Sequence, residues 1–121
     1  MAVHFTLKRW WPDGKGGLMD LYLAIKSGSK TVEYRDFKEF WTIRLLNKRG
    51  REDLGHILYT APDPYDFNIY FAGSRLKHQE ATFTVGMVKY PKLRCKITGV
   101  TLDLKAKQYH IHITDPVEEQ E

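Results

Sequence analysis

Apolar and polar residues alternate along several segments of the chain, with the period of two that is typical of half-buried strands. In residues 3–7, for example, Val3, Phe5 and Leu7 are separated by polar side chains. Strands are predicted at residues 3–7, 30–35, 54–60, 67–71, 81–87 and 93–97, and a closing hairpin at residues 102–113. Strands therefore dominate the second half of the chain.

Helical spacing marks two segments in the first half. A helix is predicted over residues 18–27, and Gly28 can end it because glycine adopts a left-handed cap without steric cost. A second helix is expected after Asp36 and Glu39, which resemble a capping box, and before Gly50. The apolar faces are Leu18, Leu21, Tyr22 and Ile25 in the first helix, and Phe37, Phe40, Trp41 and Leu45 in the second.

Helices early and antiparallel strands late predict an α+β fold, a small closed or nearly closed, mixed or antiparallel β-barrel with helices at its side. A loop is expected at residues 61–64, since the prolines there cannot serve in a central strand. The 121 residues suit a single domain, which we assign to residues 1–115. Residues 116–121 are expected to form an acidic C-terminal tail.

The composition narrows the class of protein. Hydrophobic residues make up 42% of the chain and aromatic residues 13%, which excludes a disordered composition. The sequence has no run of about 18 apolar residues, so we expect no membrane-spanning helix and no membrane partner. The single cysteine, Cys95, excludes an internal disulfide and fits a reducing compartment, so we expect a cytoplasmic protein. The net charge of +4 is compatible with a polyanionic partner.

The segment between the first helix and the next strand reads GSKTVEYR, which has the form G-x-K-x-x-E-x-R. On a strand, Thr31, Glu33 and Arg35 point to one face. Val32 and Tyr34 point to the other face, and we expect them to pack in the core. Thr31, Glu33 and Arg35 then lie together on the opposite, polar face of the strand.

Three side chains of this motif can bind a ligand or transfer a proton if they line a cleft. Arg35 can hold a phosphate or a carboxylate in a fork. Glu33 can accept from the amino group of a base, or take a proton from water or a 2′-hydroxyl. Lys30 supplies a mobile positive charge, or a base where burial lowers its pKa. The alternative is a solvated, ion-paired strand face with no ligand.

The motif follows an amphipathic helix and enters a strand, and in this context it resembles the signature of the ASCH domain, a branch of the PUA-like superfamily. The resemblance is sharpest over residues 18–35. It implies a small β-barrel with helices beside it and a cleft lined by the motif. Because the family is associated with RNA binding, RNA or a nucleotide-like ligand is the expected partner, with DNA as an alternative. The ligand-binding residues implied are Lys30, Thr31, Glu33, Tyr34 and Arg35.

Some small bacterial members of that family are hydrolases, which include amidohydrolases acting on acylated cytidines and members with ribonuclease activity. In those amidohydrolases a lysine that matches Lys30 is catalytic, whereas their threonine three positions later is Glu33 here. A hydrolase that acts on a modified nucleoside or on RNA, with Lys30 or Glu33 as general base, is therefore an alternative to a binding domain. A protein-interaction module with a basic face is a third alternative.

Aromatic and basic residues outside the motif provide further candidates for nucleic-acid contacts. An exposed Trp10 or Trp11 can stack on a base beside neighbouring basic residues. Arg94 and Lys96 share the outward face of a strand and can track phosphates. The alternatives are a tryptophan that covers the end of the barrel, and ordinary surface charge.

No metal and no cofactor are predicted. His110 and His112 have a spacing that can hold zinc, but no third ligand is indicated by spacing. Cys95 lies on the apolar face of its strand, so we expect a buried core thiol and not a nucleophile. The chain lacks the G-x-x-x-x-G-K-[ST], G-x-G-x-x-G and G-x-S-x-G motifs of P-loop nucleotidases, Rossmann cofactor sites and α/β-hydrolases.

Overall fold

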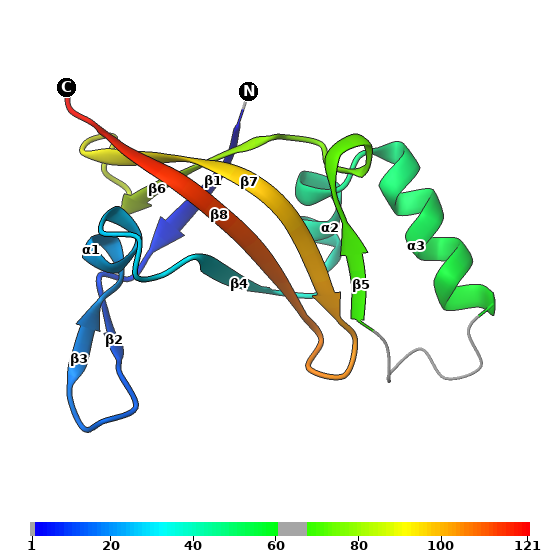
Figure 1. Cartoon of the computed structure of the whole chain (residues 1–121), viewed down its shortest axis with the longest axis horizontal. Helices are drawn as coiled ribbons and strands as arrows, with labels where there is room; N and C mark the ends of the chain where they lie inside the picture. The colour runs from blue at the N-terminus through cyan, green and yellow to red at the C-terminus, as the bar shows by residue number, and fades with distance from the viewer. Residues whose placement is uncertain (1, 61–67) are drawn as a thin grey trace.

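The computed structural model describes residues 2–60 and 68–121, and this part of the chain contains a curled sheet, a separate hairpin and three α-helices (Figure 1). The strands are β1 (Ala2–Leu7), β2 (Trp10–Pro12), β3 (Leu18–Asp20), β4 (Val32–Asp36), β5 (Asn68–Phe71), β6 (Glu80–Val85), β7 (Lys92–Asp103) and β8 (Gln108–Glu119). The helices are α1 (Leu21–Lys26), α2 (Glu39–Leu45), α3 (Lys48–Thr60) and the short 3-10 helix η2 (Gly73–Arg75). None of the described helices is long and apolar enough to cross a membrane. The loop predicted at residues 61–64, and Phe67 of a predicted strand, lie outside the described residues.

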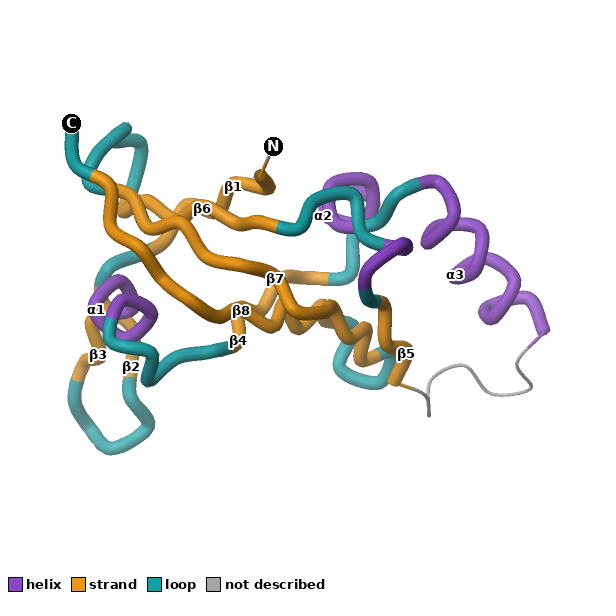
Figure 2. Tube along the Cα trace, turned by 45° about the horizontal axis from the view of Figure 1, so that its top comes forward, coloured by secondary structure: helices purple, strands orange, loops and turns teal. Residues whose placement is uncertain are grey.

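The main sheet is curled into a half-barrel, in which the strands follow the order β1-β6-β7-β8-β4 and β5 pairs with β7. β1 and β6 are parallel, and the other neighbours are antiparallel. The long strands β7 and β8 cross the molecule side by side (Figure 2). β1 and β4 are the two ends of this path, and among the described residues no ladder joins them. The predicted α+β class is confirmed, and the sheet stays open along a seam between β1 and β4.

The core covers the inner face of the sheet, which we define by the buried side chains of β7 and β8. Phe5 of β1 stacks on Phe83 of β6, with 5.2 Å between ring centroids, and on Trp41 of α2, with 5.1 Å. Tyr109 is fully buried, and its hydroxyl lies 2.6 Å from Thr42 Oγ1, so its polar end is satisfied. The buried inner-face residues are Leu93, Cys95, Ile97, Val100 and Leu102 in β7 and Tyr109, Ile111 and Ile113 in β8.

The first predicted helix is shorter than expected. Residues 18–20 form β3 and pair with β2, and Asp20 then caps α1 by accepting from Leu23 N at 3.1 Å. Gly28 follows the helix with a φ of +82°, in the left-handed conformation that the sequence predicts. The predicted capping box at Asp36 is wrong, because Asp36 is the last residue of β4 and pairs with β8 instead of capping α2.

The predicted strand at residues 54–60 is also wrong, because these residues form the second half of α3. Leu54, Ile57 and Leu58 recur at helical spacing and pack against the core. Asn47 fixes the start of the helix, since its Oδ1 accepts from a backbone N–H in the first turn at 2.9 Å. A short apolar run fits a strand or a helix equally well, and here the packing of these residues against the core favours the helix.

The closing strands differ in length from the prediction. β6 ends at Val85, and Gly86, with a φ of +64°, forms the turn that follows and not a bulge. β7 unites the segments predicted at residues 93–97 and 102–104 into one strand. Residues 116–119, which the sequence suggested as part of an acidic tail, continue β8.

Gly50 offers a test of the packing between α3 and η2. A Cβ atom at Gly50 would lie 2.5 Å from the backbone oxygen of Arg75, which cannot move without displacing η2. We expect Gly50→Ala to lower the free energy of unfolding by about 1–3 kcal/mol, measured by urea denaturation. In the matched variant Gly55→Ala, nothing lies within 4 Å of the new Cβ. That variant should gain up to about 1 kcal/mol from helix propensity, and equal effects of the two substitutions would contradict the packing.

Candidate functional site

A cleft of about 700 Å³ opens at the seam between β1 and β4. One wall is formed by Lys30, which precedes β4, and by Glu33, Tyr34 and Arg35 of β4. The opposite wall consists of residues 6–8 at the end of β1, and Trp11 and Met19 from the β2–β3 hairpin line one end. The structure therefore brings the predicted lysine, glutamate and arginine together on one cleft wall, beside one of the two predicted tryptophans.

Glu33 is the most unusual side chain of the cleft, because it is a carboxylate that is only 7% exposed. Its Oε1 atom accepts a hydrogen bond from Tyr34 N at 3.0 Å. Its Oε2 atom is buried and has no hydrogen-bond partner among the described residues. An unsatisfied buried acceptor destabilises the fold, so a polar group that lines a cleft in this state is a marker of a binding site.

Two cations flank this carboxylate without bonding to it directly. Lys30 Nζ lies 3.9 Å from Glu33 Oε1, and Arg35 Nη2 lies 4.0 Å from Glu33 Oε2. Both distances are longer than a hydrogen bond but short enough for strong electrostatic attraction at a buried site. The two cations thus lie on either side of the carboxylate, while its second oxygen stays open to a donor.

Lys30 is held against the start of β4. Its ammonium group donates to the carbonyl of Val32 at 2.6 Å and lies 5.2 Å from the centroid of the Tyr34 ring. Burial lowers the pKa of Lys30 below its usual range, and the neighbouring guanidinium of Arg35 acts in the same direction. The Glu33 carboxylate opposes this shift but does not cancel it. Lys30 therefore loses its proton more readily than an exposed lysine.

Arg35 connects the two sides of the seam. Its Nη2 atom donates to the carbonyl of Thr6 in β1 at 3.1 Å. Its guanidinium carbon lies 5.1 Å from the centroids of both Phe5 and Trp41, so the planar group packs on the aromatic core. The Nε atom is buried and has no hydrogen-bond partner among the described residues. Arg35 thus shapes the cleft and also presents a donor that the protein leaves unused.

The orientation predicted for β4 is only half right. Glu33 and Arg35 do share a face, but that face points inward, because Glu33 pairs with the buried Ile111 of β8. Val32 and Tyr34 do not pack in the core, and Tyr34 is 50% exposed. β4 is an end strand whose inner face borders the cleft, so the rule that apolar residues face inward does not hold there.

Of the remaining motif residues, Tyr34 lines the cleft and Thr31 does not. Tyr34 lines the cleft from the edge of β4, and its ring packs edge-to-face on His110 at 4.8 Å. Thr31 is exposed and borders a separate cavity of about 110 Å³ on the other side of Lys30. The cleft therefore contains four of the five predicted ligand-binding residues, with Thr31 outside it.

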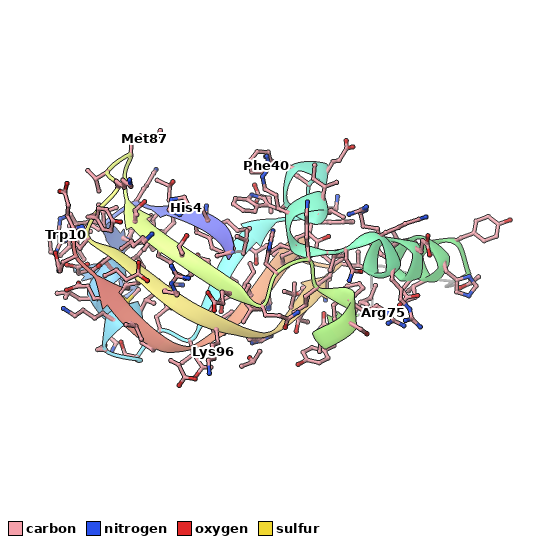
Figure 3. All side chains as sticks on the ribbon, turned by 90° about the horizontal axis from the view of Figure 1, so that it is seen from above. His4, Trp10, Phe40, Arg75, Met87 and Lys96 are labelled. Carbon is pink, nitrogen blue, oxygen red and sulfur yellow. The ribbon has the colours of Figure 1, made fainter. Side chains whose placement is uncertain are left out.

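The two predicted tryptophans lie on opposite faces of the β2–β3 hairpin. Trp11 pairs with Met19 across the hairpin, and both side chains line the cleft. Trp10 is 57% exposed, does not line the cleft and lies at the end of the molecule far from Arg75 and α3 (Figure 3). The sequence could not separate their roles, because neighbouring residues on a strand always point to opposite faces.

Arg94 and Lys96 lie on the outer face of the sheet, away from the cleft. Arg94 donates to Glu80 at 3.0 Å and to Glu119 at 2.7 Å, and Lys96 lies 3.9 Å from Asp115. These three carboxylates, which come from β6 and β8, offset the charge of both cations. The outer face of the sheet around Arg94 and Lys96 is thus less basic than the sequence alone indicates.

The other candidates stay outside the cleft. Cys95 is buried in the core as predicted, and burial raises the pKa of its thiol to about 11. His112 Nε2 lies 2.9 Å from Thr101 Oγ1, which occupies one of the nitrogens that zinc would need. The described residues contain no group of three or more histidine, cysteine, aspartate or glutamate side chains able to hold a metal ion.

Several cleft residues lie outside the motif. Among them, Lys8, Met19 and Gln108 come from separate segments that converge only in the folded chain. Met19 has a partial signal: the turn residues at 12–17 are compatible with a hairpin that places Met19 opposite Trp11, although the apolar spacing predicts a helix over residues 18–27.

No family model matches the chain, and no curated protein and no solved structure shows significant similarity to it.

The electrostatic coupling within the cleft predicts a measurable change in Lys30. Because the Glu33 carboxylate raises the pKa of Lys30, the substitution Glu33→Gln should lower that pKa further. The pKa can be read from the carbon-13 NMR shift of Lys30 Cε during a pH titration. Glu52→Gln, on the exposed surface of α3, is the matched control and should leave Lys30 unchanged. A Lys30 pKa that is constant or higher in Glu33→Gln would contradict this arrangement.

Proposed function

We propose that the protein binds RNA or a nucleotide by holding one nucleobase in the cleft at the seam. The observation that carries this proposal is the buried Glu33 carboxylate, whose Oε2 atom has no partner among the described residues. A ligand that donates an N–H group to this oxygen would satisfy it, and nucleobases carry such donors on their amino and imino groups. We further propose an ASCH-type, PUA-like domain, which is supported by the position of the G-x-K-x-x-E-x-R motif on the cleft wall.

The size and the lining of the cleft fit a base. Its volume of about 700 Å³ lies within the range of roughly 300–1,000 Å³ that is usual for small-molecule sites. Trp11 and Met19 supply a flat aromatic surface and a soft apolar contact at one end. Proteins that read unpaired bases combine stacking on an aromatic ring with hydrogen bonds to the edge of the base, and this cleft contains both elements.

The charges of the cleft favour one orientation of such a ligand. The unpaired Glu33 Oε2 atom needs a hydrogen-bond donor, which the edge of a base supplies and an ionised phosphate does not, so the base belongs there. Lys8, which is exposed at the opposite wall, can attract the phosphate. Lys8 Nζ lies 5.8 Å from the Trp11 ring centroid, so a base stacked on Trp11 would have its phosphate within reach of this cation. The cleft thus offers a negative group for the base and a positive group for the backbone.

A hydrolase that acts on a modified nucleoside or on RNA is the second candidate function. It is favoured by the lowered pKa of Lys30, which lies beside Glu33 on the same wall. A lysine with a lowered pKa gives up its proton more readily than an exposed lysine and can act as a general base. In this case the nucleobase would bind as above, and the bond to be cleaved would lie close to Lys30.

Fluorescence anisotropy with labelled single-stranded RNA, duplex RNA and single-stranded DNA tests the proposal. Wild-type binding to single-stranded RNA should weaken as salt rises, because the backbone contacts release counterions. Glu33→Gln should weaken binding about tenfold or more, since it removes the acceptor charge opposite the base; one such contact contributes about 1–3 kcal/mol. Arg94→Gln, on the outer face, is the matched control and should bind like the wild type.

The outcomes separate the alternatives. Equal binding by the wild type and Glu33→Gln would contradict a base in the cleft, and a loss confined to Arg94→Gln would move the site to the outer face. Release of product from an acylated nucleoside or from RNA, lost in Lys30→Met, would establish the hydrolase. Absence of both binding and turnover would leave the protein-interaction module of the sequence analysis.

A further inference from the structure

The β2–β3 hairpin, which we call the arm, projects from the half-barrel and pairs only with itself among the described residues (Figure 1). All of β2 is exposed, and β3 is exposed or half-buried. Its turn is closed by side-chain hydrogen bonds, in which Asp13 Oδ1 accepts from the backbone of Lys15 at 2.7 Å and of Gly17 at 3.1 Å. The arm is therefore a defined structural element that contributes no side chain to the buried core.

The outer face of the arm carries apolar surface that the fold leaves in water. Trp10 is 57% exposed and Leu18 is 65% exposed, and both lie on the face opposite Trp11 and Met19. The Arg9 guanidinium lies 6.0 Å from the Trp10 ring centroid, and Asp20 holds it there at 2.9 Å. A large exposed aromatic side chain with a fixed cation beside it marks a contact surface rather than a packing defect.

The charge of this region indicates a polyanionic occupant. Residues 8–30 contain five lysines and arginines (Lys8, Arg9, Lys15, Lys26 and Lys30) against two acids (Asp13 and Asp20). Both acids are engaged within the chain, Asp13 in the turn and Asp20 with Arg9 and the cap of α1. Among the described residues, Lys8 and Lys15 have no ion-pair partner. Positive charge without an ion-pair partner thus lies beside Trp11, in Lys8, and in the turn of the arm, in Lys15.

We infer that the arm extends the cleft into a binding site for a single-stranded polynucleotide, with Trp11 stacking on the base in the cleft and Trp10 stacking on a base further along the same strand. The arm is continuous with the cleft through Trp11 and Met19, and it is only two strands wide, so a bound strand can pass over its edge from one face to the other. Stacking platforms combined with neighbouring cations are the usual means of holding single strands. The inference rests on the proposed function and adds that the ligand is a polymer.

Isothermal titration calorimetry with ligands of rising length tests this inference. The ligands are adenosine and cytidine 5′-monophosphates and alternating adenylate–cytidylate RNA oligomers of two, four and six nucleotides. For the wild type we expect the affinity to rise about tenfold or more between the monophosphates and the tetramer, as one additional stacked base provides. Trp10→Ala should remove this gain and leave the affinity for the monophosphates unchanged. Tyr59→Ala, which removes a 90% exposed aromatic side chain from α3, is the matched control and should behave as the wild type.

The results that would contradict this inference differ from the results that would contradict the proposed function. Monophosphate binding that depends on Glu33 but does not increase with length would overturn the role of the arm and leave the nucleotide site intact. An equal loss for monophosphates and oligomers in Trp10→Ala would overturn it too, because Trp10 would then belong to the cleft. Binding of the wild type to vesicles of anionic lipid, lost in Trp10→Ala, together with no gain with length, would assign the arm to a membrane surface instead. Binding of no nucleotide ligand at all would overturn both proposals.

Discussion

The open seam between β1 and β4 is the constraint on which the rest of the molecule depends. A sheet that curls but does not close leaves two strand edges facing each other, and unpaired edges are costly unless they are covered or bridged. Here the bridge is a side chain: Arg35 reaches from β4 to the carbonyl of Thr6 and packs on Phe5 and Trp41. The same side chain therefore spans the seam, lines the cleft and brings a positive charge within 4.0 Å of Glu33.

The buried carboxylate shows how stability and binding compete in this cleft. Glu33 occupies an inward position on β4 where an apolar residue would pack against the core, and its Oε2 atom is left without a partner among the described residues. Lys30 and Arg35 offset part of that cost by their charges, at the expense of burying two cations. Natural proteins commonly accept such a cost where a ligand repays it, and the polar cluster of the seam fits that pattern.

Much of the fold could be predicted from local pattern, and the exceptions have identifiable causes. The alternation of Val3, Phe5 and Leu7 correctly predicts β1, because a half-buried strand repeats every two residues. The run after Leu54 was ambiguous, and only packing against the core shows that it is helical. The motif indicated which side chains gather at the cleft. It could not indicate that Tyr34 faces outward, since the face of an end strand depends on the strand beside it. Lys8 and Gln108 could not be predicted as cleft residues, because tertiary contacts alone bring them to the cleft.

The parallel pairing of β1 with β6 has a consequence for how the protein forms. His4 bonds to Thr82, 78 residues further along the chain, so β1 leaves the ribosome long before its partner exists. Contacts of such large sequence separation form slowly, because the chain must first lose the entropy of a long loop. β4 must likewise wait for β8, its one neighbour in the sheet among the described residues. The cleft wall that contains β4 therefore forms only after β8 has been made, and a chain that lacks β7 and β8 would expose the aromatic arm and the edge of β1 without a cleft between them.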